Sequence, residues 1–170
     1  MKQFVILLTL CLIKTGAFGQ GISDLSFLLG DWKVKRVYSL NTEKVREYAG
    51  TMSSVYSLDS TFIECRFEFE RPNQKRAMDL VFFNYNSIYN QYESVWLSST
   101  WPVIVLMEGK IEQNVLSTVA KFPLGDGRTE YVRDTIEFTE NKLFRRTYIT
   151  TDSTQVNWTF HLMEESVTIN

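Results

Sequence analysis

Histidine and cysteine are scarce in this chain of 170 residues. His161 is the only histidine, and Cys11 and Cys65 are the only cysteines. A typical zinc site takes most of its ligands from these residue types, and no His-Glu-x-x-His segment is present. The sequence also lacks a Gly-x-Ser-x-Gly turn, so a serine hydrolase would have no exposed nucleophile. We therefore expect no metal centre, no cofactor and no catalysis.

Clusters of positive charge are missing as well. The chain has 18 Lys and Arg against 20 Asp and Glu, a net charge of −2. Nucleic acids and anionic membrane surfaces select proteins with basic patches. The sequence therefore predicts neither of them as a partner.

Long apolar runs occur only at the start of the chain. Lys2 precedes an uncharged run from Phe4 to Ile13, and Ala17-Phe18-Gly19 places small residues where a signal peptidase needs them. The sequence predicts a signal peptide over residues 1–19 and export to the periplasm or beyond. Residues 20–170 are then one domain with a net charge of −4 and no membrane segment.

Cleavage would leave Cys65 as the only thiol, so no disulfide would form within the domain. The alternation Ile63-Glu64-Cys65-Arg66-Phe67 places this thiol on an apolar face. We expect it to be buried in the core.

Short strands separated by turn residues make up the rest of the chain. Glu140-Asn141 has the composition of a tight hairpin turn, and Gly125-Asp126-Gly127 offers positions for positive φ. The predicted strands are 31–39, 45–57, 61–70, 76–85, 91–98, 103–109, 114–122, 130–138, 142–150 and 155–163.

Short connections between consecutive strands favour an antiparallel meander. Alternating faces, such as Val132, Asp134, Ile136 and Phe138 on one side of a strand, require one buried and one wet surface. A flat sheet of about ten strands would leave two exposed edges. The sequence therefore predicts an all-β, up-and-down antiparallel barrel with a short N-terminal helical turn near residues 23–29.

The junction Gly30-Asp31-Trp32, after paired leucines, resembles the opening of the calycin superfamily, which includes lipocalins, fatty-acid-binding proteins and nitrobindins. The closer likeness is to uncharacterised bacterial secreted lipocalin-like barrels, in which "FLLGDW" opens the first strand. In those proteins an aromatic stretch like residues 83–96 precedes a strand ending in a glycine like Gly109. The resemblance covers most of residues 24–150 and implies a ten-stranded barrel with a ligand cavity.

The same resemblance implies that Gly30 and Trp32 close one end of the barrel. The Trp32 indole N–H would then need a hydrogen-bond acceptor. Nitrobindins hold haem through a late histidine, so His161 is a haem ligand if haem is bound and if this residue faces the lumen. Lys33-Val34-Lys35 stands where nitrobindins carry further glycines.

Large aromatic side chains and arginines are the remaining candidates for binding. Rings with one polar group suit a cavity that grips an apolar molecule, and an inward arginine can meet a carboxylate. The predicted ligand-binding residues are Tyr85, Trp96, Trp101, Arg66, Arg133 and Arg145.

The sequence thus predicts an exported protein that binds a small hydrophobic or amphipathic molecule without catalysis. Three alternatives stay open: a haem-binding barrel that uses His161, a small isomerase or hydrolase acting in the lumen, and a module whose barrel is filled by its own side chains. Glu64, Glu68 and Glu70 offer carboxylates for acid–base work, but they share a strand face with Arg66 and are expected to lie outside.

Overall fold

The computed structural model describes residues 20–40, 44–71, 75–101 and 103–169. The predicted signal peptide, residues 1–19, lies outside the described residues. Within the described ranges, no helix has both the length and the apolar character that crossing a membrane requires.

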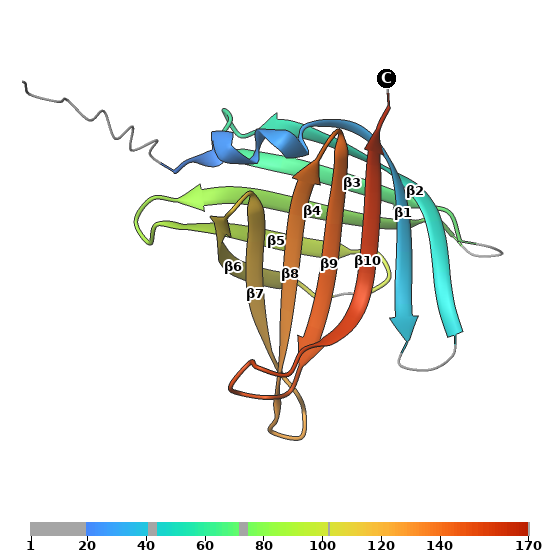
Figure 1. Ribbon diagram of the computed structural model, residues 1–170, viewed down its shortest axis with the longest axis vertical. Helices are drawn as coiled ribbons and strands as arrows, with labels where there is room; N and C mark the ends of the chain where they lie inside the picture. The colour runs from blue at the N-terminus through green and yellow to red at the C-terminus, as the bar shows by residue number, and fades with distance from the viewer. Residues whose placement is uncertain (1–19, 41–43, 72–74, 102, 170) are drawn as a thin grey trace, which may run out of the picture.

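Within the part of the chain that the structure describes, ten strands follow one short helix, as the sequence predicts (Figure 1). The elements are η1 (Ile22–Leu28), β1 (Gly30–Leu40), β2 (Lys44–Ser57), β3 (Phe62–Phe69), β4 (Ala77–Asn86), β5 (Gln91–Ser98), β6 (Val105–Glu112), β7 (Val115–Pro123), β8 (Thr129–Thr139), β9 (Lys142–Thr150) and β10 (Thr159–Thr168).

Each strand pairs antiparallel with its neighbours in the sequence, and β10 pairs with β1 to close the barrel. Closure leaves no unpaired edge along the ring of strands, which removes the usual site of edge-to-edge aggregation. The prediction of a closed up-and-down barrel is confirmed.

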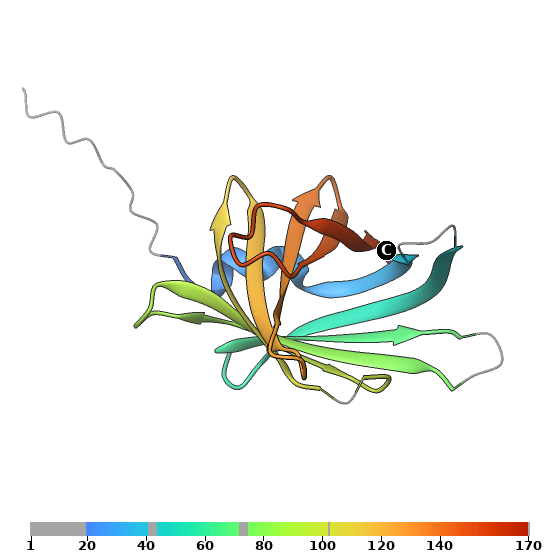
Figure 2. The same ribbon diagram turned by 90° about the horizontal axis from the view of Figure 1, so that it is seen from below.

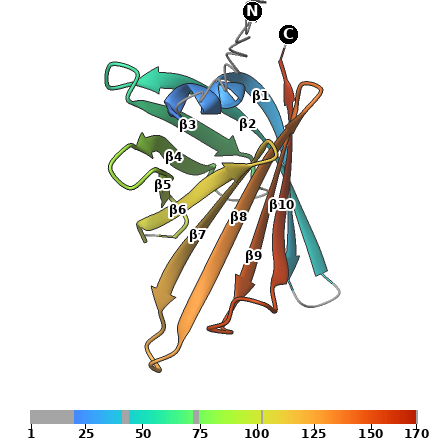
Figure 3. The same ribbon diagram turned by 60° about the vertical axis from the view of Figure 1, so that its left-hand side comes forward.

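The helix η1 lies across one end of the barrel (Figures 1 and 3). Gly21 N–H donates to Asp24 Oδ2 at 3.1 Å, and Tyr92 Oη donates to the same oxygen at 2.6 Å. Two side chains of the helix itself, Leu25 and Leu28, are buried. The helix is thereby fixed to β5 and seals this end with apolar side chains.

Trp32 lies at this sealed end and is 2% exposed. Its indole Nε1–H donates to the backbone oxygen of Leu28 at 3.1 Å, which is the kind of acceptor that the sequence required. Gly30, between η1 and β1, has φ +113°, a conformation that L side chains rarely adopt. The glycine therefore allows the chain to turn sharply from the helix into the first strand.

The opposite end of the barrel is the mouth. The connections β7–β8 and β9–β10 lie there, and Figure 2 views the molecule from that side. Residues near the ends of β1, β5 and β9 and the starts of β4, β8 and β10 therefore surround the mouth.

The last strand differs from its predicted position. The alternation predicts a strand over 155–163, but residues 155–158 belong to a connection, and β10 runs from Thr159 to Thr168. Asp152 accepts hydrogen bonds from Thr154 and Asn157, and Gln155 has φ +55°. These local bonds hold a turn where the apolar pattern suggested a strand.

Candidate functional site

The barrel interior is filled on the side of η1. Met52, Cys65, Phe67 and Phe83 pack there among other buried apolar residues. The space left among them amounts to about 30 Å³, room for about one water molecule. Among the residues that the structure describes, this half of the barrel is a packed core.

A layer of charged side chains lies above this core, at mid-barrel. Arg36 Nη1 donates to Asp79 Oδ2 at 2.6 Å, and its Nε is paired with Glu164 Oε1. Arg36, Asp79 and Glu164 are each at most 4% exposed. The guanidinium also lies over the Phe69 ring, with Cζ 3.8 Å from the ring centroid.

Arg145 extends this layer across the barrel. Its guanidinium pairs with Asp134, and its Nη1 lies 3.6 Å from Glu164 Oε2. Thr147 Oγ1 donates to the other Asp134 oxygen at 2.5 Å. Glu164 therefore links the two arginines, and the five charges form one connected layer.

The carboxylates determine the protonation state of the arginines. Burial lowers the pKa of each guanidinium, but the neighbouring carboxylates outweigh it, Glu164 most for Arg36 and Asp134 most for Arg145. The net direction of both pKa shifts is upward, so both side chains stay charged. Removing either partner would leave an uncompensated charge in the interior.

Between this layer and the mouth lies a cavity of about 420 Å³. Trp96 and Trp101 form one wall, with ring centroids 6.2 Å apart, and Val132, Ile149 and Leu162 add apolar surface. Arg36, Asp79 and Arg145 form the polar floor. The lining is thus mostly apolar with a few fixed polar groups, as in sites that hold small molecules.

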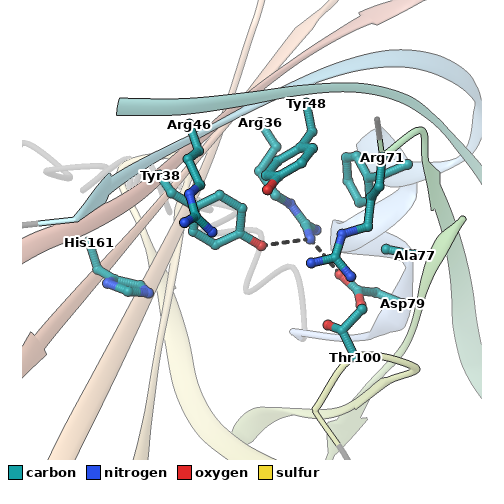
Figure 4. Close-up of a pocket in the computed structure, with 10 residues that line it drawn as sticks. Arg36, Tyr38, Arg46, Tyr48, Arg71, Ala77, Asp79, Thr100 and His161 are labelled. Atoms are coloured by element: carbon teal, nitrogen blue, oxygen red, sulfur yellow. Dashed lines mark hydrogen bonds and ion pairs between the residues drawn. The ribbon is translucent and has the colours of Figure 1, made fainter. Parts of the chain in front are cut away.

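A second cavity of about 300 Å³ lies beside the first at the mouth. The two cavities share five lining residues: Arg36, Tyr38, Asp79, Thr100 and His161. Figure 4 shows that Arg46, Arg71, Tyr48 and His161 surround the same space. Aromatic rings from three strands lie in a row here. The ring centroids of Tyr48 and Tyr38 are 5.8 Å apart, and those of Tyr38 and His161 are 6.1 Å apart.

Two buried donors at these cavities have no hydrogen-bond partner within the described part of the chain. They are Arg36 Nη2 and Trp96 Nε1. A buried donor without a partner costs free energy, so both nitrogens are unusual features of this region.

No group of three or more His, Cys, Asp or Glu side chains arranged to hold a metal ion occurs among the residues that the structure describes. The carboxylates of the interior layer are engaged with arginines instead.

The model of one protein family, described as protein of unknown function (DUF1579), matches residues 23–164. The chain belongs to this family. No curated protein matches it.

Among solved structures, the S-type phycobiliprotein lyase of Guillardia theta is similar to this DUF1579 barrel, with a TM-score of 0.57. The alignment covers 89% of this chain and 94% of that chain at 11% sequence identity. The likeness at this identity is one of fold, and it supports the calycin-like barrel that the opening motif indicated. The finer resemblance, to bacterial secreted barrels, stays a prediction.

Three of the ligand-binding residues predicted from the sequence lie at the larger cavity: Trp96, Trp101 and Arg145. Arg145 is engaged in the charged layer, with its Cζ 5.4 Å from the Trp96 ring centroid. The other two form the aromatic wall. That they bind a ligand remains a prediction.

The other three lie elsewhere. Tyr85 is near the sealed end, where its ring contacts Tyr92 and its hydroxyl donates to Asn90 Oδ1 at 2.5 Å. Arg66 is on the outer face of β3, paired with Glu64 at 3.3 Å. Arg133 is on the outer face of β8, and its Cζ lies 4.5 Å from the Trp158 ring centroid. The structure does not bring these residues to the cavity.

Sequence reasoning missed Arg36, Asp79 and Glu164 as interior residues. The signal was present in the alternation, because Arg36 follows Trp32 and Val34 on one face, and Asp79 lies between Ala77 and Val81. A charged residue in phase with an apolar face is the pattern that identifies such a layer.

His161 reaches the cavity through an irregularity in β10. The pairing of β10 with β9 shifts between Phe160 and Leu162, so His161 has no partner in the register. Leu162, Glu164 and Ser166 then face inward. Strict alternation would place His161 and Leu162 on opposite faces of β10. Because the register shifts, both residues line the larger cavity.

Proposed function

We infer that this chain binds a small hydrophobic or amphipathic molecule in the mouth of its barrel and carries out no chemical step. The observation that carries this proposal is the cavity of about 420 Å³, walled by Trp96 and Trp101 above a fixed floor of ion pairs. Because the floor is held rigidly by buried salt bridges, the cavity is largely formed before a ligand enters.

The charged layer favours binding over catalysis. Polar residues do converge inside the barrel, as the enzymatic alternative requires. However, each of its three carboxylates is held by an arginine: Asp79 and Glu164 by Arg36, and Asp134 by Arg145. Carboxylates engaged in ion pairs are less free to meet a substrate, so a binding role fits these groups better.

Export also belongs to this proposal. It rests on the apolar run and the small residues near position 19 of the sequence.

Filling the cavity tests the proposal. Val132 lines it from β8, so Val132→Phe places a ring in the space that a ligand would occupy. We expect the protein to enhance the fluorescence of the neutral probe N-phenylnaphthylamine, and the variant to bind it about tenfold more weakly or worse. The measurement is a fluorescence titration.

Val119→Phe is the matched control, because Val119 is half-buried on β7 and pairs with Arg133 on the outer face. It should bind the probe as the unmodified protein does. Equal binding by all three proteins, or no binding at all, would contradict the proposal. Native mass spectrometry of protein from its own host would identify a co-purifying ligand.

A second candidate function, haem binding, is favoured by the position of His161 on both mouth cavities. A neutral imidazole nitrogen is a common axial ligand of haem iron. Titration with hemin should then produce a Soret band that is lost in His161→Ala. A band that persists in the variant, or none in the unmodified protein, would exclude this function.

A further inference from the structure

The smaller mouth cavity differs from the larger one in its charge. Arg36, Arg46 and Arg71 line it, and Asp79 is the only acidic residue of its lining among the residues that the structure describes. Asp79 and Glu164 already neutralise Arg36. The positive charge of Arg46 and Arg71 is therefore uncompensated by the lining of this cavity.

Arg46 and Arg71 come from different elements. Arg46 lies on β2 and Arg71 just after β3, and both are drawn around the same space in Figure 4. Among the residues that the structure describes, neither has a carboxylate within ion-pair distance, whereas Arg66, Arg76 and Arg128 all do. Arg71 Cζ lies 6.0 Å from the Tyr48 ring centroid.

Further donors lie at the same cavity. The hydroxyls of Tyr38 and Tyr48 stand beside it, and Arg36 Nη2 lacks a partner within the described residues although its side chain is only 4% exposed. A guanidinium pair with hydroxyls around it is the arrangement that binds a carboxylate or a phosphate. The smaller cavity of this net negative chain thus carries positive charge.

We propose that the ligand is an anionic amphiphile whose carboxylate or phosphate group binds between Arg46 and Arg71. Its apolar part lies against Trp96 and Trp101 in the adjoining cavity. The two cavities share Tyr38 and Thr100 as lining residues. This inference deepens the proposed function and rests on it, because it requires a ligand in the mouth. Glu130, which also lines the larger cavity, lies on β8, away from both arginines in the strand order.

Three probes with the same chain and different head groups test this subsite: decanoate, decyl phosphate and decanol. Isothermal titration calorimetry should show that at least one anion binds about tenfold or more tightly than the alcohol, because charge-assisted hydrogen bonds are about twice as strong as neutral ones. The better of the two anions identifies the head group as carboxylate or phosphate. High salt should weaken the anions and leave decanol unchanged.

Removing the two charges should abolish this preference. In Arg46→Gln with Arg71→Gln, the anions should bind no more tightly than decanol, whose affinity should stay as it was. The matched control is Arg66→Gln with Arg76→Gln, which removes the same charge from two arginines paired with Glu64 and Glu68. The control should keep the full anion preference. Thermal unfolding of all proteins would show that each variant is folded.

The outcomes separate the two proposals. Equal binding of all three probes by the unmodified protein, or a preference that survives in the Arg46 and Arg71 variant, would overturn the anionic subsite and leave the cavity proposal standing. A failure of decanol and both anions to bind the unmodified protein would overturn both.

Discussion

At the scale of single residues, Cys65 shows how burial controls chemistry. Its side chain is 1% exposed, and burial raises the pKa of the thiol to about 12 from an ordinary value of 9.0. The native thiol therefore stays protonated and unreactive at neutral pH. This buried position agrees with the core role expected from the alternation in β3.

The pKa shift predicts a loss of stability in alkaline solution. The folded state binds the Cys65 proton more tightly than the unfolded state, so this contribution is complete below about pH 9 and is lost as the pH rises from 9 towards 12. By pH 10 the free energy of unfolding should fall by about 1 kcal/mol through this group. Urea unfolding at pH 8 and 10 should show a smaller fall for Cys65→Ala than for the unmodified protein; equal falls would refute the assignment.

At the scale of elements, the junction between η1 and β1 holds the sealed end together. The helix carries Leu28, whose oxygen accepts from Trp32, and Gly30 makes the turn between them with φ +113°. Any side chain at this position is strained by its backbone conformation and not by crowding, since an added Cβ would meet no atom within 4 Å.

Gly30→Ala should therefore lower the free energy of unfolding by about 1–3 kcal/mol, the usual cost of a strained backbone conformation. The control is Gly21→Ala at the other end of η1, where φ is −166° and the added Cβ makes only ordinary contacts. Urea denaturation measures both. A control that is destabilised as much as Gly30→Ala would mean that backbone strain is not the cause.

At the scale of the whole molecule, the interior is arranged in three layers between the seal and the mouth. An apolar core fills the half near η1, a layer of five charges crosses the middle, and the cavity of about 420 Å³ lies beyond it. Burying these charges is tolerated because each is paired. The layer separates the core from the cavity and presents fixed polar groups to the cavity.

Local pattern was enough to predict the architecture and the fate of single side chains. Period-two alternation and turn residues predicted ten strands, and the short connections between them required an antiparallel meander. The opening motif also indicated a barrel sealed near Trp32. Alternation placed Cys65 inside, and it put Glu64 and Arg66 on the outer face of β3, where they pair with each other.

The site depended on tertiary structure for three reasons. Arg46 and Arg71 meet at one cavity because the antiparallel register of β2 and β3 brings the start of β2 beside the end of β3. His161 faces that cavity because the register shifts in β10, which no alternation rule shows. The depth at which the core ends and the cavity begins is set by pairing across the barrel between Arg36, Asp79 and Glu164, residues that lie far apart in the sequence.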